Sequence, residues 1–195
     1  MNVSADPATN LPSRRKLLAA AAWTVPVIAT VTATPAFAAS QSVVSLEFTH
    51  FTAWKSTHWV SLDHEPWGYQ ALDNLAGNLG VQEGYHQQPA VLVTSIVVII
   101  SVPRAGMSSA QARVGSGSSS GWQATSTSVS ADTISYSFLW TGSISSDSGS
   151  RAVGLNFELP ATGAQVENNW FPKTLTAVAT SATANSASSS AIVSN

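Results

Sequence analysis

The chain has 195 residues, of which 44% are hydrophobic and 9% charged, and it contains no cysteine. This length suits one domain with appendages, and this composition allows a core that owes little to ion pairs. The lack of cysteine excludes a disulfide framework and any thiolate metal site. Ser, Thr, Ala, Val and Gly dominate, which favours short strands joined by polar loops and therefore an all-β fold.

The first forty residues have the features of an export signal. Arg14 and Arg15 precede a modest apolar run, and small residues at Ala36 and Ala38 supply a cleavage site after Ala38. The paired arginines, the polar lead before them and the diluted apolar run predict a twin-arginine signal peptide over 1–38, and hence a secreted or cell-surface protein. The general secretory route and a retained membrane-anchor helix are the alternatives, and two prolines in the run disfavour such a helix.

The net charge of the chain after signal cleavage indicates which classes of partner it could bind. The leader holds three of the eight basic residues and one of the ten acidic ones, so the remainder carries a net charge of −4. A weakly acidic surface with scattered cations has no electrostatic footprint for nucleic acid or for anionic lipid. We therefore expect no nucleic-acid partner. We also expect no membrane span once the signal is removed, because the most apolar stretch that remains has only twelve residues.

The predicted domain, residues 40–195, opens with the alternating segment Val43–Phe51, which is typical of a strand with one buried face. The alternation breaks at His50, which predicts a β-bulge or a strand end there. From 54 to 88, glycines and prolines interrupt any period. We expect an irregular excursion there, with a helical turn or two at Ala71–Leu79, that packs its aromatic rings over one side of the domain.

The most apolar stretch is Val91–Val102, closed by Pro103. Its apolar residues fall on both parities, which predicts a central strand covered on both faces. Twelve residues are too few for a membrane helix, which needs about 20, and β-branched side chains favour a strand.

Further strands are predicted along the rest of the chain. In the two clearest, the inward residues are Ile134, Tyr136, Phe138 and Trp140, and then Val153, Leu155, Phe157 and Leu159. The others are Ala110–Val114, Trp122–Val129, Lys173–Ala184 and Ala191–Val193. Seven or more short strands separated by turn signals favour an antiparallel β-sandwich.

This strand pattern follows a leader that contains Arg-Arg, Ala-Trp-Thr-Val-Pro-Val and Ala-Phe-Ala-Ala-Ser. Together they resemble short secreted proteins of actinobacteria with an immunoglobulin-like domain. The likeness covers about residues 13–40 and 90–184 and leaves the segment 54–88 without a counterpart. It implies an immunoglobulin-like antiparallel β-sandwich, and it carries no catalytic residue and no cofactor.

Two short motifs match known signatures without their context. Gly117–Gly121 matches G-x-S-x-G, but the catalytic form needs a strand-to-helix elbow, and no helix signal follows here. Leu159–Gly163 spells a sortase pentapeptide, but no apolar segment with a basic tail comes after it. We interpret the first as a flexible loop and the second as a strand end with a turn.

Four histidines and three carboxylates of the first half could suit Zn²⁺ or a similar ion: His50, His58, His64 and His86, with Asp63, Glu65 and Glu83. Their spacing contains no H-x-x-x-H pattern. Unrelated structural histidines are the favoured interpretation. A metal site is the alternative, and an enzyme built on this cluster is a third and weaker hypothesis.

The aromatic residues Trp54, Trp59, Trp67 and Tyr69 are the remaining candidates. Burial in the core is the commonest fate of such rings. If exposed, they would form a platform that stacks on sugar rings. The sequence thus predicts a secreted or cell-surface, non-catalytic binding or structural protein with an extracellular or cell-wall partner. The alternative is a carbohydrate-binding module.

Overall fold

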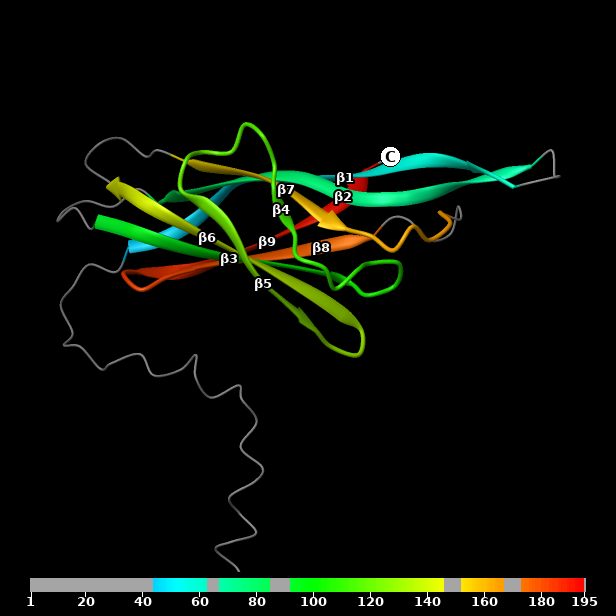
Figure 1. Ribbon diagram of the computed structural model, residues 1–195. Coiled ribbons are helices and arrows are strands. Elements are labelled where there is room, and N and C mark those ends of the chain that lie inside the picture. The colour runs from blue at the N-terminus through cyan, green and yellow to red at the C-terminus, as the bar shows by residue number, and fades with distance from the viewer. Residues whose placement is uncertain (1–43, 63–66, 85–91, 146–151, 167–172, 195) are drawn as a thin grey trace, which may run out of the picture. The chain divides into compact units, whose positions relative to one another are not determined.

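The computed structural model describes residues 44–62, 67–84, 92–145, 152–166 and 173–194, which all lie in one compact unit, Ser42–Asn195 (Figure 1). The described residues form nine strands and no helix, which confirms the predicted all-β class. Consequently, no described helix is long and apolar enough to cross a membrane. The predicted leader lies outside the described residues. The strands are β1 (Val44–Ser61), β2 (Gly68–Glu83), β3 (Leu92–Pro103), β4 (Arg113–Val114), β5 (Trp122–Val129), β6 (Thr133–Ser145), β7 (Val153–Pro160), β8 (Thr174–Ser181) and β9 (Ala184–Ser194).

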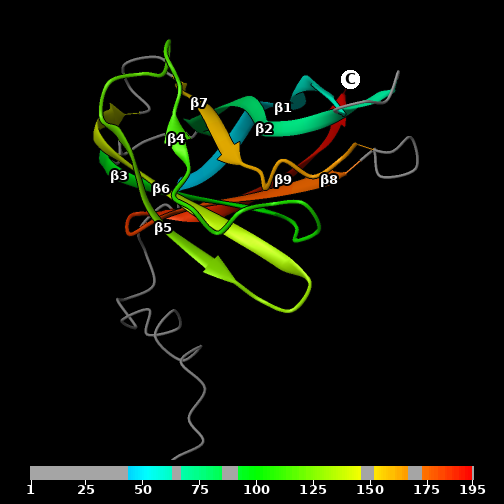
Figure 2. The same ribbon diagram turned by 45° about the vertical axis from the view of Figure 1, so that its right-hand side comes forward.

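The strands form one mixed sheet in the order β4-β7-β2-β1-β9-β8-β3-β6-β5. Every described pair of neighbours is antiparallel except β1 with β9, so the prediction of a purely antiparallel arrangement is wrong at this pair. The sheet curls until its two ends meet (Figures 1 and 2). There Gln111 Nε2 donates to Ala124 O at 2.8 Å, and Thr127 Oγ1 donates to Ala110 O at 3.3 Å. The result is a nearly closed sheet with two facing walls.

The core fills the space between these walls. Phe138 of β6 and Phe157 of β7 meet across it with ring centroids 6.4 Å apart, and Phe157 also lies 6.2 Å from Phe51 of β1. The inward residues predicted for β6 and β7 are all buried. That prediction holds because strict alternation with one apolar parity marks a strand with one covered face.

Strand β3 differs from its prediction. It lies in the middle of its wall, between β8 and β6, but Ile99 is 36% exposed and Leu92 51% exposed. A register shift between Val93 and Ser95 turns Val93 into the core, so that it joins the buried face of Ile96 and its successors. The prediction that both faces of this strand are covered is therefore wrong, because an antiparallel wall of this kind leaves one face exposed to solvent.

The predicted irregular excursion at 54–88 is also wrong. Strand β1 continues to Ser61 and pairs with β2 over nearly its whole length, so the expected helical turn at Ala71–Leu79 is strand. Leu72 and Leu75 are both buried although they are three residues apart, since Asp73 is an extra residue at a bulge between them. This bulge gives a strand the spacing of a helix.

Of the two alternatives predicted at His50, the structure has the bulge and not the strand end, with a register shift between Phe48 and His50. Farther along, the hairpin leaves the sheet, because β7 pairs with β2 only over Asn74–Val81. We call residues 55–61 and 67–73 the arm; Figure 1 shows it extending past the other strands. One edge of the arm is bonded to the segment after β7, where Leu72 N donates to Ala164 O at 3.0 Å and Val166 N donates to Gln70 O at 2.7 Å.

Candidate functional site

The predicted aromatic residues lie on the arm and at its base. Trp54 is 39% exposed, Trp59 57% and Trp67 74%, whereas Tyr69 is half-buried. The expectation of burial in the core is therefore wrong for the three tryptophans. Scattered exposed apolar residues are normal on a protein, but three exposed indoles on one hairpin are a concentration that points to binding.

The strand register divides these rings between the two faces of the hairpin. Side chains alternate along β1, so Trp54 lies on the face turned away from the core and Trp59 on the opposite face. Tyr69 pairs with Val60 and shares the face of Trp54, about 20 Å away along the strand. The four rings thus form no single flat platform, and they follow the hairpin along its length.

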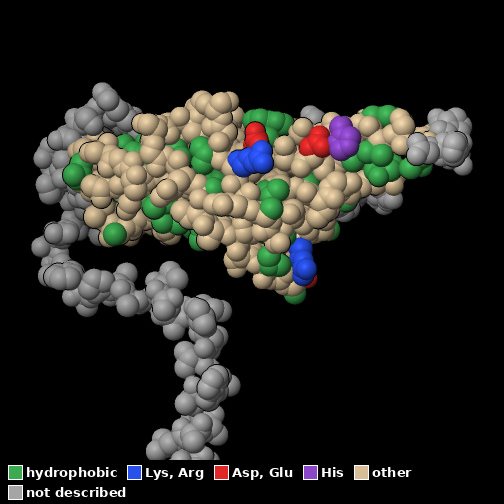
Figure 3. All heavy atoms as spheres, in the orientation of Figure 1, with side chains coloured by type: hydrophobic (Ala, Val, Ile, Leu, Met, Phe, Trp, Pro, Cys, Tyr) green, Lys and Arg blue, Asp and Glu red, His purple; other side chains and the backbone are tan. Residues whose placement is uncertain are grey.

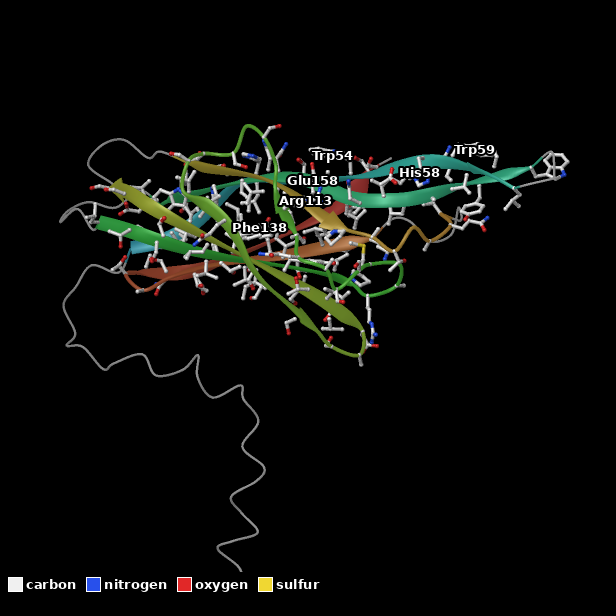
Figure 4. All side chains as sticks on the ribbon, in the orientation of Figure 1. Trp54, His58, Trp59, Arg113, Phe138 and Glu158 are labelled. Carbon is white, nitrogen blue, oxygen red and sulfur yellow. The ribbon has the colours of Figure 1, made fainter. Side chains whose placement is uncertain are left out.

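Trp54 begins a row of side chains that crosses four strands. The register pairs Trp54 with Ala76, Ala76 with Glu158, and Glu158 with Arg113. The row runs over β1, β2, β7 and β4 on the face turned away from the core, which we call the outer face. Trp54 and Glu158 are two strand spacings apart, about 10 Å, with only the methyl group of Ala76 between them. Figure 4 shows Trp54, Glu158 and Arg113 over these adjacent strands.

A pocket of about 240 Å³ opens beside this row. Its walls come from the bulge of β2, from β4 with the residues before it, and from the end of β7. Figure 3 shows this face with a basic side chain close to an acidic one and, toward the arm, an acidic side chain beside a histidine. The lining residues are Asp73, Asn74, Ala110, Gln111, Arg113, Glu158 and Pro160.

The histidines do not converge as far as the structure describes them. His50 contacts Thr49 Oγ1 at 3.0 Å, and His58 Nδ1 lies 2.5 Å from Asp73 Oδ1. Eight residues of extended strand separate these two imidazoles by about 26 Å, so they cannot share an ion. His64, His86 and two of the predicted carboxylates, Asp63 and Glu65, lie outside the described residues, and Glu83 is buried at the end of β2. Within the described ranges, no three His, Asp or Glu side chains could hold a metal.

The two short motifs have structural roles. Ser119 of the G-x-S-x-G match accepts a hydrogen bond from Gly154 N at 3.0 Å, its own amide donates to Gly154 O at 2.8 Å, and a strand follows the loop. In the sortase-like pentapeptide Leu159 is buried, and Thr162 N donates to Gly106 O at 3.0 Å. The interpretation of that pentapeptide as a strand end is confirmed, since β7 ends at Pro160, but no turn follows directly.

Comparison with known proteins finds no match among protein-family models, curated proteins or solved structures. The row and the pocket are therefore interpreted from their own chemistry. Sequence reasoning missed Asp73, Arg113 and Glu158 as site residues, because they come from distant segments and only the strand register unites them. The one available signal was the rarity of charge, since 9% of the residues are charged and three such side chains line one small pocket.

Proposed function

We propose that this chain is an exported, non-catalytic protein that binds a carbohydrate chain along the β1–β2 hairpin. The observation that carries the proposal is the exposure of Trp54, Trp59 and Trp67 on one projecting hairpin. A tryptophan offers a large rigid apolar face and an N–H donor, a combination enriched at binding surfaces. A sugar ring presents an apolar C–H face to such an indole and hydroxyl groups to its surroundings.

The position of the rings supports an extended ligand. A two-stranded ribbon twists strongly, so side chains on alternating faces can be met in turn by one chain that follows the ribbon. Trp54 and Trp59 are five residues apart on β1, about 17 Å, which spans several sugar units. The scattered cations and the acidic balance of the chain offer no competing electrostatic site for nucleic acid.

The export and the fold family are part of the same proposal. We propose that residues 1–38 are a twin-arginine signal, supported by Arg14 and Arg15 and by the cleavage pattern at Ala36 and Ala38. The nine strands and the two facing walls support an immunoglobulin-like sandwich of the kind carried by actinobacterial secreted proteins. Wild-type protein should leave the cytosol and start at Ala39, whereas an R14K/R15K variant should stay inside. Wild-type protein that remains unprocessed in the cytosol would refute this part.

A retention experiment tests the carbohydrate binding. Purified protein is incubated with insoluble polysaccharides and isolated cell walls, and bound protein is measured after washing. We expect Trp59→Ala and Trp67→Ala each to weaken retention by about tenfold, which corresponds to about 1.4 kcal/mol. Val178→Ala is the matched control, because Val178 is 39% exposed but lies on β8, which does not pair with either strand of the hairpin. Equal retention of all variants, or no retention of wild-type protein, would contradict the proposal.

A further inference from the structure

The pocket beside the outer-face row has both donors and acceptors of hydrogen bonds. Asp73 and Glu158 supply carboxylate acceptors, Arg113 supplies guanidinium donors, and Gln111 supplies an amide. Asp73 Oδ1 lies 2.5 Å from His58 Nδ1, so Oδ2 is the oxygen of this carboxylate that is left for a ligand. Glu158 and Arg113 are partners in the strand register, yet no salt bridge joins them in the part of the chain described. Gln111 Nε2 donates to Ala124 O, so its carbonyl oxygen is the group left for a ligand.

Asn74 gives a second and independent indication. Its Oδ1 is buried, and it accepts no hydrogen bond from the described residues. A buried polar atom without a partner costs about 1–3 kcal/mol, and such atoms are uncommon in folded proteins. Because Asn74 also lines the pocket, rotation of its amide toward a donor in the pocket would relieve that cost.

The charges narrow the chemistry of the ligand. Two carboxylates, Asp73 and Glu158, disfavour an anion, and the guanidinium of Arg113 beside Glu158 reduces the attraction for a cation. The volume of about 240 Å³ is below the usual range for drug-sized ligands and suits one small ring. On the outer-face row the polar groups give way to the methyl group of Ala76 and then to the indole of Trp54, so the ligand should have one polar edge and one apolar face.

We infer that this pocket is a subsite for one neutral sugar unit, whose hydroxyl groups bond to Asp73, Glu158 and Arg113 while the adjoining unit packs on Trp54. The inference rests on the proposed carbohydrate binding and adds a ligand class to it. The protein should bind neutral sugars more tightly than uronic acids, because the carboxylate of a uronic acid would face Asp73 and Glu158.

Calorimetric titration of the protein with a neutral and an acidic oligosaccharide of equal length tests this subsite. Arg113→Met should weaken the binding of the neutral oligosaccharide about tenfold, the low end of the effect of losing a hydrogen bond to a charged group, because Arg113 is exposed. Arg104→Met is the matched control, because Arg104 is an exposed arginine in the loop after β3, and it should bind as wild type. Glu158→Gln should reduce the preference for the neutral oligosaccharide over the acidic one.

The outcomes separate the subsite from the broader proposal. If Trp59→Ala loses binding while Arg113→Met and Glu158→Gln bind as wild type, the hairpin binds carbohydrate and the subsite is wrong. If wild-type protein binds the acidic oligosaccharide at least as well as the neutral one, the inferred specificity is wrong. If wild-type protein binds neither oligosaccharide and no polysaccharide, the proposed function and the subsite are both overturned.

Discussion

Gly77 offers a sharp test of how closely the neighbouring strands β1 and β7 approach β2. It is buried on β2, where the register pairs it with Ala53 of β1 and with Phe157 of β7. A Cβ added to Gly77 would lie 2.3 Å from Phe157 Cζ and 2.4 Å from the backbone oxygen of Thr52. The ring can swing away at some cost in packing. The backbone oxygen can move only if the β1–β2 ladder opens, so Gly77→Ala should destabilise the domain.

The expected loss is about 1–3 kcal/mol, the range found when a methyl group is forced into a filled core. For a domain of this size, each kcal/mol lowers the melting temperature by about 2–4 °C, so the shift should be about 2–12 °C. Gly154→Ala is the control on the neighbouring strand, since its Cβ would meet only Ser119 Oγ, at 3.9 Å. That variant should stay within about 0.5 kcal/mol of wild type.

Urea unfolding of the three proteins, fitted with a common slope, measures the difference. A Gly77→Ala variant as stable as Gly154→Ala would refute the reasoning, because it would mean that Phe157 and Thr52 do not approach β2 as closely as the structure has them.

Four further predictions concern the core and the pocket. Burial lowers the pKa of Lys173 to about 8, so the unfolded chain binds more protons than the folded one between that pH and the ordinary value of 10.5. Urea midpoints should therefore rise from pH 8 to pH 10 and rise less in Lys173→Met; equal slopes would contradict this. Burial raises the pKa of Tyr136 to about 12. The contribution of its neutral hydroxyl to the free energy of unfolding is therefore complete below pH 10 and is lost as the pH rises toward 12. Phe138→Ala, which removes the ring contact with Phe157, should cost about 3–5 kcal/mol in urea unfolding, and a loss below 1 kcal/mol would mean that the two walls do not meet there. Asn74→Leu removes the buried oxygen without a partner and should leave the thermal midpoint unchanged or higher while it weakens oligosaccharide binding; a clear drop in the midpoint would show that the amide is bonded in the folded state.

The sequence allowed correct prediction of the buried residues where every second residue of a strand is apolar without interruption. The segments Thr133–Trp140 and Ala152–Leu159 are of this kind, and all eight residues assigned to their inner faces are buried. The irregularity at His50 was also predictable, because the alternation of apolar and polar residues breaks there, although that break alone did not tell a bulge from a strand end.

Prediction failed where the deciding contact is not local. The apolar residues of Val91–Val102 have no property that tells a two-sided strand from a one-sided strand with a few exposed aliphatic side chains, and Ile99 is one of these. Residue type predicts burial of tryptophan only on average. The exposure of Trp59 and Trp67 follows from the length of the hairpin, which carries them beyond the strands that would have covered them.

Asp73 links the failure in the fold to the failure in the site. As an extra residue in β2 it places Leu72 in the core together with Leu75, and that spacing imitates a helix. The same bulge carries the carboxylate of Asp73 to the outer face, beside His58 and into the wall of the pocket. A regular strand at this point would preserve the alternation of buried and exposed residues and would place no acidic group on the outer face there. Bulges re-aim side chains next to binding sites in many sheets. Asp73, the extra residue that made β2 difficult to predict as a strand, therefore also gives the proposed subsite one of its two carboxylates.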